Sequence, residues 1–196
     1  PKILVTGEGS WRSDTGAFIA QGSGSPIAGA PLQFPATGDT TRMRAQASLR
    51  GLQIDALRTL LAPHVQLPAD IEATGVGDLE VVLVRETARS TLDANLTVRG
   101  AGFQNSDYTW IGEKLQFTLQ GSVELSATPI TFALLANAAN GQALAGPVLL
   151  DFDKNPLTLR VTGNHAATGL QITELRSEQR DLATVVGTAA LRLAPF

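Results

Sequence analysis

The sequence predicts an all-β protein built as an antiparallel meander. Three segments, 92–98, 115–119 and 157–161, alternate apolar and polar residues with a period of two. This period places the apolar side chains of a strand on one face of a sheet. Short connections between such segments favour antiparallel pairing, with one face apolar and the other facing water. A β-sandwich, a barrel and a curled open sheet all fit the pattern.

The composition narrows the class of protein further. The 196 residues include 19 Gly and 10 Pro, and 17% are charged, which suits strands and turns. The net charge of −3 offers no basic stripe for nucleic acid. The lack of cysteine excludes disulfides, thiolate metal sites and a cysteine nucleophile. No apolar run reaches the length of a membrane-spanning helix.

Residues 1–196 are expected to form one β-rich domain, with Gly/Ser/Pro-rich edge strands in 1–41 and the main meander in 42–196. Strands are predicted at 2–6, 43–49, 79–83, 91–99, 114–121, 122–128, 130–136, 143–152, 156–162, 169–175 and 184–193. Turns are predicted at 105–107, 140–141, 153–156 and 163–164. Asp55 is expected to cap a two-turn helix over 55–62 that Pro63 ends. Because the chain begins without methionine, we expect a mature form or a piece of a longer protein.

The sequence offers little that could carry catalysis. His64 and His165 are far apart and have no partner at ligand or acid–base spacing. Asp151 and Asp153 could hold a cation, but a turn explains them more simply. Nucleophile-elbow, phosphate-loop, dinucleotide and zinc-protease motifs do not occur. We therefore expect no enzyme activity, metal or cofactor, and we interpret Gly75-Val76-Gly77 as a bulge or tight turn.

Aromatic residues are few, at 5%, so a carbohydrate-binding platform is not expected. Tyr108 and Trp110 lie near a predicted hairpin turn, where we expect them to pack on cross-strand neighbours. The remaining apolar residues are mostly Ala, Leu and Val. This composition fits either an ordinary closed core or a wall that binds an apolar ligand.

Two stretches resemble a known group of envelope proteins. Residues 49–63 (LRGLQIDALRTLLAP), then Leu67-Pro68 and residues 75–83 (GVGDLEVVL), resemble the AsmA-like and TamB-like proteins of Gram-negative envelopes. Residues 96–117 (LTVRGAGFQNSDYTWIGEKLQF) are similar to the YdbH branch of that group. The resemblance covers roughly residues 43 to 196. Protein N of the type II secretion apparatus carries a similar sheet.

The resemblance implies a long, curled sheet, a β-taco, that moves phospholipid between the inner and outer membranes and so serves outer-membrane biogenesis. It implies a periplasmic location and an inner-membrane tether outside this chain. The implied partners are phospholipid acyl chains and, through the sheet edges, other envelope proteins. The alternative function is a scaffold or assembly component of an envelope machine such as the type II secretion system.

On this reading the alternating apolar residues line the groove, whereas in a closed protein they would form a sealed core. The candidate groove residues are Leu79, Val81, Leu83, Leu92, Leu96, Val98, Leu115, Phe117, Leu119, Ile130, Phe132, Leu134, Leu157, Leu159 and Val161. The predicted helix would plug one end of the sheet or mark a boundary between modules.

Overall fold

A computed structural model describes residues 4–61, 70–166 and 169–192 and shows one 13-stranded sheet with one short helix. The predicted all-β antiparallel meander is confirmed. The strands are β1 (Val5–Trp11), β2 (Phe18–Ile27), β3 (Ala30–Gln33), β4 (Ala36–Gly38), β5 (Arg42–Gln53), β6 (Glu72–Glu86), β7 (Ser90–Gln104), β8 (Trp110–Glu124), β9 (Ile130–Ala145), β10 (Val148–Asp151), β11 (Leu157–Ala166), β12 (Gly169–Gln179) and β13 (Ala183–Arg192). The helix α1 (Ile54–Leu61) connects β5 to β6.

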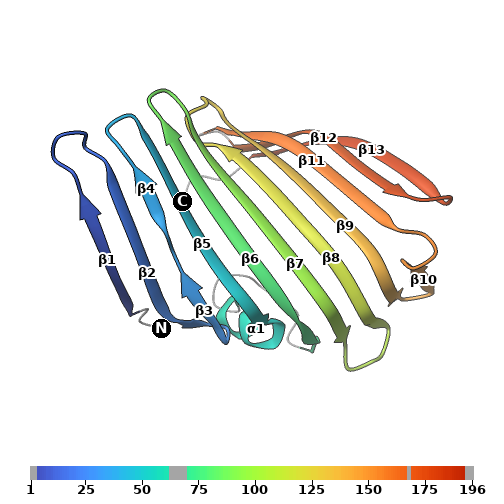
Figure 1. Cartoon of the computed structure of the whole chain (residues 1–196). Coiled ribbons are helices and arrows are strands. Elements are labelled where there is room, and N and C mark those ends of the chain that lie inside the picture. The colour runs from blue at the N-terminus through green and yellow to red at the C-terminus, as the bar shows by residue number, and fades with distance from the viewer. Residues whose placement is uncertain (1–3, 62–69, 167–168, 193–196) are drawn as a thin grey trace.

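Neighbouring strands follow the chain order from β1 to β13. Two short strands depart from it: β4 lies between β2 and β5, as β3 does, and β10 folds back on β9. Figure 1 shows one layer whose strand direction turns, so that β12 and β13 pass behind β9. Since the path of paired strands begins at β1 and ends at β13, the described residues form an open sheet rather than a barrel or a sandwich.

The register of the central strands keeps apolar residues opposite apolar residues. Leu79 of β6 pairs with Leu49 of β5 and Leu96 of β7, and the row continues to Leu119 of β8. Directly paired residues share a face, so such rows build one continuous surface. We call this surface the apolar face. On β5–β9 and β11 it comprises Ala45, Ala47, Leu49, Leu52, Gly77, Leu79, Val81, Leu83, Leu92, Ala94, Leu96, Val98, Phe117, Leu119, Gly121, Val123, Phe132, Leu134, Ala136, Ala138, Leu157, Leu159, Val161 and Gly163.

A row of bulges crosses the sheet near the α1 end. Gly51, Gly75, Gly100 and Gly141 have φ of 78, 127, 59 and 90°, and Lys114 of β8 has φ of 53°. The pairing register shifts at or next to each of these residues. Bulges bend a strand and increase its twist, so the sheet bends along this row. Gly75 confirms the bulge predicted from Gly75-Val76-Gly77.

The buried core lies along this row of bulges and is small. One cluster contains Val98, Ala101, Leu115 and Phe152, with Ile54 of α1 packed against it. A second contains Ala30, Leu49 and Leu52. The start of α1 and the Phe152 turn therefore fill the apolar face at this end of the sheet.

Several predicted boundaries are wrong for one shared reason. Residues 140–141 and 163–164 lie inside β9 and β11 rather than in turns, so His165 belongs to a strand. Segments 114–121 and 122–128 belong mainly to one strand, β8, and 143–152 spans the hairpin from β9 to β10. Glycine supplies the unusual backbone conformations of both turns and bulges, so its presence does not distinguish them.

The N-terminal region and the helix need smaller corrections. Strand β1 starts at Val5 and extends to Trp11, beyond the predicted 2–6, and 1–41 contributes β1–β4 to the same sheet. Because α1 begins at Ile54, Asp55 lies in the first turn of the helix and is not its N-cap. In the first turn its carboxylate interacts favourably with the positive end of the helix dipole. Pro63 and His64 lie outside the described residues.

Aromatic rings on this sheet lie over glycines of the neighbouring strand. Gly163 pairs with Phe132, and a Cβ added to Gly163 would lie 2.6 Å from the Phe132 ring. Phe103 covers its paired glycine, Gly112, in the same way. The ring shields the backbone that a glycine leaves bare, and it stays close to the sheet.

Replacing Gly163 by alanine should destabilise the fold. The added methyl would meet the Phe132 ring and the Gln171 carbonyl oxygen, which is backbone and cannot swing aside. We expect a loss of about 2 kcal/mol in the free energy of unfolding, measured by urea denaturation. Gly187→Ala is the control, because a Cβ there meets nothing within 4 Å. Equal stability of the two variants would contradict this account of Gly163.

The carboxylate of Asp78, on β6, connects the two neighbouring strands β5 and β7. It accepts hydrogen bonds from the Gly51 backbone N–H at 2.9 Å and from Arg99 Nη2 at 2.6 Å. The Gly51 hydrogen bond, followed by the Arg99 hydrogen bond, lowers the pKa of Asp78 below its usual value. The folded state therefore favours the charged form of this carboxyl group.

Asp78→Asn should reduce stability at neutral pH, and the difference from wild type should shrink in acid. Because the pKa of Asp78 is lower in the folded state, its contribution is complete above the unfolded carboxyl pKa of about 4 and is lost as the pH falls through the folded value. Urea unfolding from pH 7 to pH 2.5 measures this. Asp93→Asn is the control, since within the described part of the chain the Asp93 carboxylate forms no hydrogen bond or ion pair. A difference independent of pH would contradict the assignment.

Candidate functional site

The candidate residues chosen from the sequence all lie on the apolar face or continue it. Most belong to its paired rows, Ile130 lies two residues before Phe132 on β9, and Leu115 lies opposite Ala101 beside the buried cluster. The alternating residues of five separate strands are therefore brought into one surface. Most of these side chains are half-buried, neither sealed inside nor fully open to solvent.

Two of the candidates belong to the core instead. Val98 is 1% exposed and Leu115 is 8% exposed, and both pack in the cluster that contains Phe152. The chain's own side chains cover them, so we correct these two positions from groove-lining to core residues. The part of the apolar face that the described chain leaves uncovered lies away from the α1 end, around Leu83, Leu92 and their neighbours.

The two faces of the sheet differ in how enclosed they are. Ala94 and Ala136 on the apolar face are half-buried, whereas Ala133 on the opposite face of β9 is exposed. Because the three side chains are identical, the difference reflects their surroundings and not their size. The apolar face is thus the more sheltered face, although no second layer of strands or helices from the described residues covers its central part.

The accessible surface of the chain is large for its mass. It measures 13088 Å², whereas a compact protein of 20.5 kDa exposes about 8,900 Å². Val98 and Leu52 are the only large described side chains below 2% exposure. The excess area is what a single-layer sheet with two accessible faces produces.

The middle of the apolar face contains a low point. Ala94 of β7 pairs with Gly121 of β8, which pairs with Leu134 of β9. A Cβ added to Gly121 would meet only Leu134 Cδ1, at 3.8 Å. Larger side chains, including Leu92 and Leu96, stand on either side along the strands. These small residues therefore leave a shallow trough over β7 and β8, bounded across the strands by Val81 of β6 and Leu134 of β9, a feature the sequence analysis did not identify.

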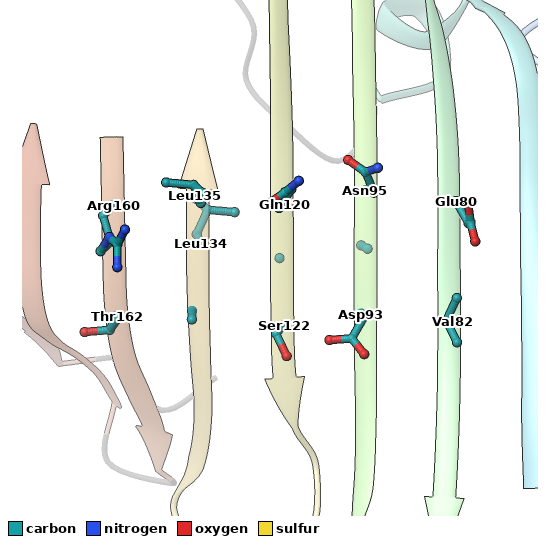
Figure 2. Close-up of a pocket in the computed structure, with 13 residues that line it drawn as sticks. Glu80, Val82, Asp93, Asn95, Gln120, Ser122, Leu134, Leu135, Arg160 and Thr162 are labelled. Carbon is teal, nitrogen blue, oxygen red and sulfur yellow. The ribbon is translucent and has the colours of Figure 1, made fainter. Parts of the chain in front are cut away.

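The opposite face is polar and holds a hollow of about 520 Å³ (Figure 2). Residues of this face line it from β6, β7, β8, β9 and β11: Glu80, Val82, Asp93, Asn95, Gln120, Ser122, Ala133, Leu135, Arg160 and Thr162. Three residues of the apolar face, Ala94, Gly121 and Leu134, also border it. Glu80 accepts a hydrogen bond from Gln46 at 3.0 Å. The lining includes two hydroxyl groups, two carboxylates, two carboxamides and one guanidinium, so the hollow offers both hydrogen-bond donors and acceptors.

The remaining polar candidates are explained locally. Asp151 accepts hydrogen bonds from the Lys154 backbone N–H and from Gln142 Nε2, and it pairs with Lys154 Nζ at 3.2 Å. These contacts belong to the predicted turn at 153–156. Among the described residues, no group of three His, Cys, Asp or Glu side chains could hold a metal ion. His165 is exposed on β11 between Ile130 and Leu170, neither of which can exchange a proton with it.

Tyr108 and Trp110 do not pack on cross-strand neighbours as expected. Tyr108 is 63% exposed and Trp110 is 53% exposed, because Trp110 lies opposite the small Ala145. The sequence shows that aromatic residues flank a turn, but whether a large partner faces them depends on the register of the neighbouring strand.

Comparison of the chain with protein-family models, with curated protein sequences and with solved structures gave no match. Within the described ranges, no helix is long and apolar enough to cross a membrane.

Proposed function

We propose that the apolar face binds the acyl chains of phospholipids and conducts them along the sheet. The observation that carries this proposal is a continuous, mostly aliphatic surface, spread over β5–β9 and β11, that the described chain leaves uncovered away from the α1 end. The resemblance to AsmA-like and YdbH-type proteins supports the setting: a periplasmic module, tethered to the inner membrane, that moves phospholipid between the two envelope membranes.

The chemistry of the face suits hydrocarbon better than a protein partner. Its rows on β5–β9 and β11 contain no charged side chain and no Tyr, Trp or Arg, the residues that anchor most protein interfaces. Burial of an acyl chain stabilises the complex by about 0.8 kcal/mol per CH₂ without preferred direction. A chain held in this way can slide, since no single position holds it much more tightly than the next.

The dimensions of the face also fit a lipid tail. One tail spans about 15 Å, half of the hydrocarbon core of a bilayer. From β5 to β11 the sheet extends about 24 Å across the strands, and residues two apart on one strand are separated by about 7 Å. A tail lying across the strands, over Ala94 and Gly121, would contact the larger side chains on both sides of the trough. The headgroup would remain in water.

The trough gives a direct test. Gly121→Leu should fill it without displacing backbone, because a Cβ there is 3.8 Å from its nearest neighbour, and we expect co-purified phospholipid, measured by native mass spectrometry, to fall several-fold. Gly187→Leu on β13 is the matched control, because it has the same free space but lies on the edge strand. Urea unfolding shows whether both variants remain folded.

A second readout locates the lipid. A photoreactive residue at Leu159, on the apolar face, should crosslink to phospholipid, whereas one at Arg160, on the polar face, should not. Absence of lipid from the wild-type protein, or equal crosslinking from both faces, would rule out the proposal.

The free sheet edges favour a second candidate, a scaffold for assembly of an envelope machine. Strand β1 is exposed throughout, and Val185 and Val186 on β13 are 57% and 64% exposed. Unpaired edges bind partners by strand addition. If the protein is a scaffold, Val185→Lys together with Val186→Lys should abolish capture of a periplasmic protein. If it is a lipid module, the same double variant should leave bound lipid unchanged, whereas Gly121→Leu should reduce it.

A further inference from the structure

We infer that the hairpin tips at the α1 end of the sheet dock into the interface of an uncharged membrane. The tips are residues 105–109, between β7 and β8, and residues 146–147, between β9 and β10. Both lie at the lower end of the sheet in Figure 1. This inference goes beyond the proposed groove and does not depend on it.

The sheet loses its polar face at this end. Trp110, Ala145 and Val148 are paired across β8, β9 and β10, and so share one face. The next row, Ile111, Leu144 and Leu149, is apolar as well, but it lies on the other face. On the face of Ile111, polar residues return two rows further in, at Glu113, Gln142 and Asp151. On β8, β9 and β10 the outermost rows are therefore apolar on both faces, whereas on β7 the row of Ile111 continues to Gln104.

The apolar side chains at the tips are open to solvent. Tyr108, Trp110, Val148 and Leu149 are 63%, 53%, 53% and 63% exposed. Trp and Tyr are the side chains that concentrate at membrane interfaces, since each has an apolar body and a polar group that stays hydrated. A thin edge that is apolar on both faces suits insertion into a bilayer interface, whereas a protein partner would require a broad face of about 800 Å².

The first tip is held in one conformation by Asn105. Its side chain accepts a hydrogen bond from the Trp110 backbone N–H at 2.9 Å and donates one to Thr109 Oγ1 at 2.9 Å. Its carbonyl accepts the Tyr108 N–H at 3.1 Å, with Tyr108 at φ of 56°, a conformation uncommon for a bulky residue. Strain of this kind persists where the surroundings impose it, often at functional sites.

The second tip is tied to the first, because the Gly146 N–H donates to the Thr109 carbonyl at 2.8 Å. The two hairpins therefore present their apolar side chains as one unit. Ordering them in advance leaves little conformational entropy to lose on docking.

The hairpin tips and the opposite end of the sheet differ in how many charged residues they carry, and this difference indicates which lipid headgroups the tips would meet. Within 105–112 and 143–150 the only charged residue is Asp107, so anionic lipid has nothing to attract it. The opposite end carries the ion pairs Arg42–Glu86 and Arg89–Glu124, at 3.3 and 3.2 Å. We therefore assign the membrane-facing role to the α1 end, with docking driven by apolar burial rather than by electrostatics.

Flotation with phosphatidylcholine vesicles tests the inference. The wild-type chain should float, and adding phosphatidylglycerol or salt should not strengthen binding. Trp110 emission, read in a Trp11→Phe background, should shift to the blue and be quenched by brominated lipid. The double variant Tyr108→Asn, Leu149→Thr should lower the partition coefficient by about tenfold or more. Asn tolerates the positive φ at 108 and Thr suits an exposed strand, so the variant should remain folded.

Val186→Thr on β13 is the matched control, since Val186 is 64% exposed but far from the tips in the strand order, and it should float like wild type. Failure of the wild type to float, equal flotation of the double variant, or dependence on phosphatidylglycerol would overturn the inference. Crosslinking at Leu159 tests lipid binding on the apolar face independently of flotation. If the protein crosslinks to lipid at Leu159 but does not float, the membrane-docking role of the tips is wrong and the proposed function is not.

Discussion

Backbone hydrogen bonding in register across the central strands is the constraint on which the rest of the structure depends. Leu49, Leu79, Leu96 and Leu119 form one surface only because β5 to β8 pair without a register shift over the segments beyond the row of bulges. A shift of one residue in any strand would move its apolar side chains to the polar face. The chain thus builds an extended aliphatic surface from strands that are individually ordinary.

The row of bulges accommodates the bend that this long register requires. Each bulge absorbs one residue in a local irregularity, after which the alternation resumes. The buried clusters lie along the same row, where Ile54 and Phe152 approach the sheet. Stability is therefore concentrated at one end, and the rest of the apolar face depends on neighbours within the sheet. On the proposed function, this division leaves a surface for a mobile hydrocarbon while the buried clusters stabilise the fold elsewhere.

Glycine has three different roles in this sheet, and the roles explain where sequence patterns mislead. At Gly75 and Gly141 it permits a bulge with positive φ, at Gly163 it makes room for a neighbouring aromatic ring, and at Gly121 it leaves open space. Only the neighbouring strand separates these cases. The turn expected at 163–164 was wrong because the ring of Phe132, 31 residues earlier in the chain, is the reason for the glycine.

The sequence by itself determined which side chains of each strand share a face, because alternation is a property of residues two apart. It therefore predicted the all-β meander and placed Leu83, Phe117 and Leu159 on one kind of surface. The tertiary structure alone decided that no described layer covers this surface, that Val98 and Leu115 are sealed within the core, and that Trp110 faces a small alanine. These outcomes depend on segments far apart in the chain meeting in one register, and no local pattern encodes that meeting.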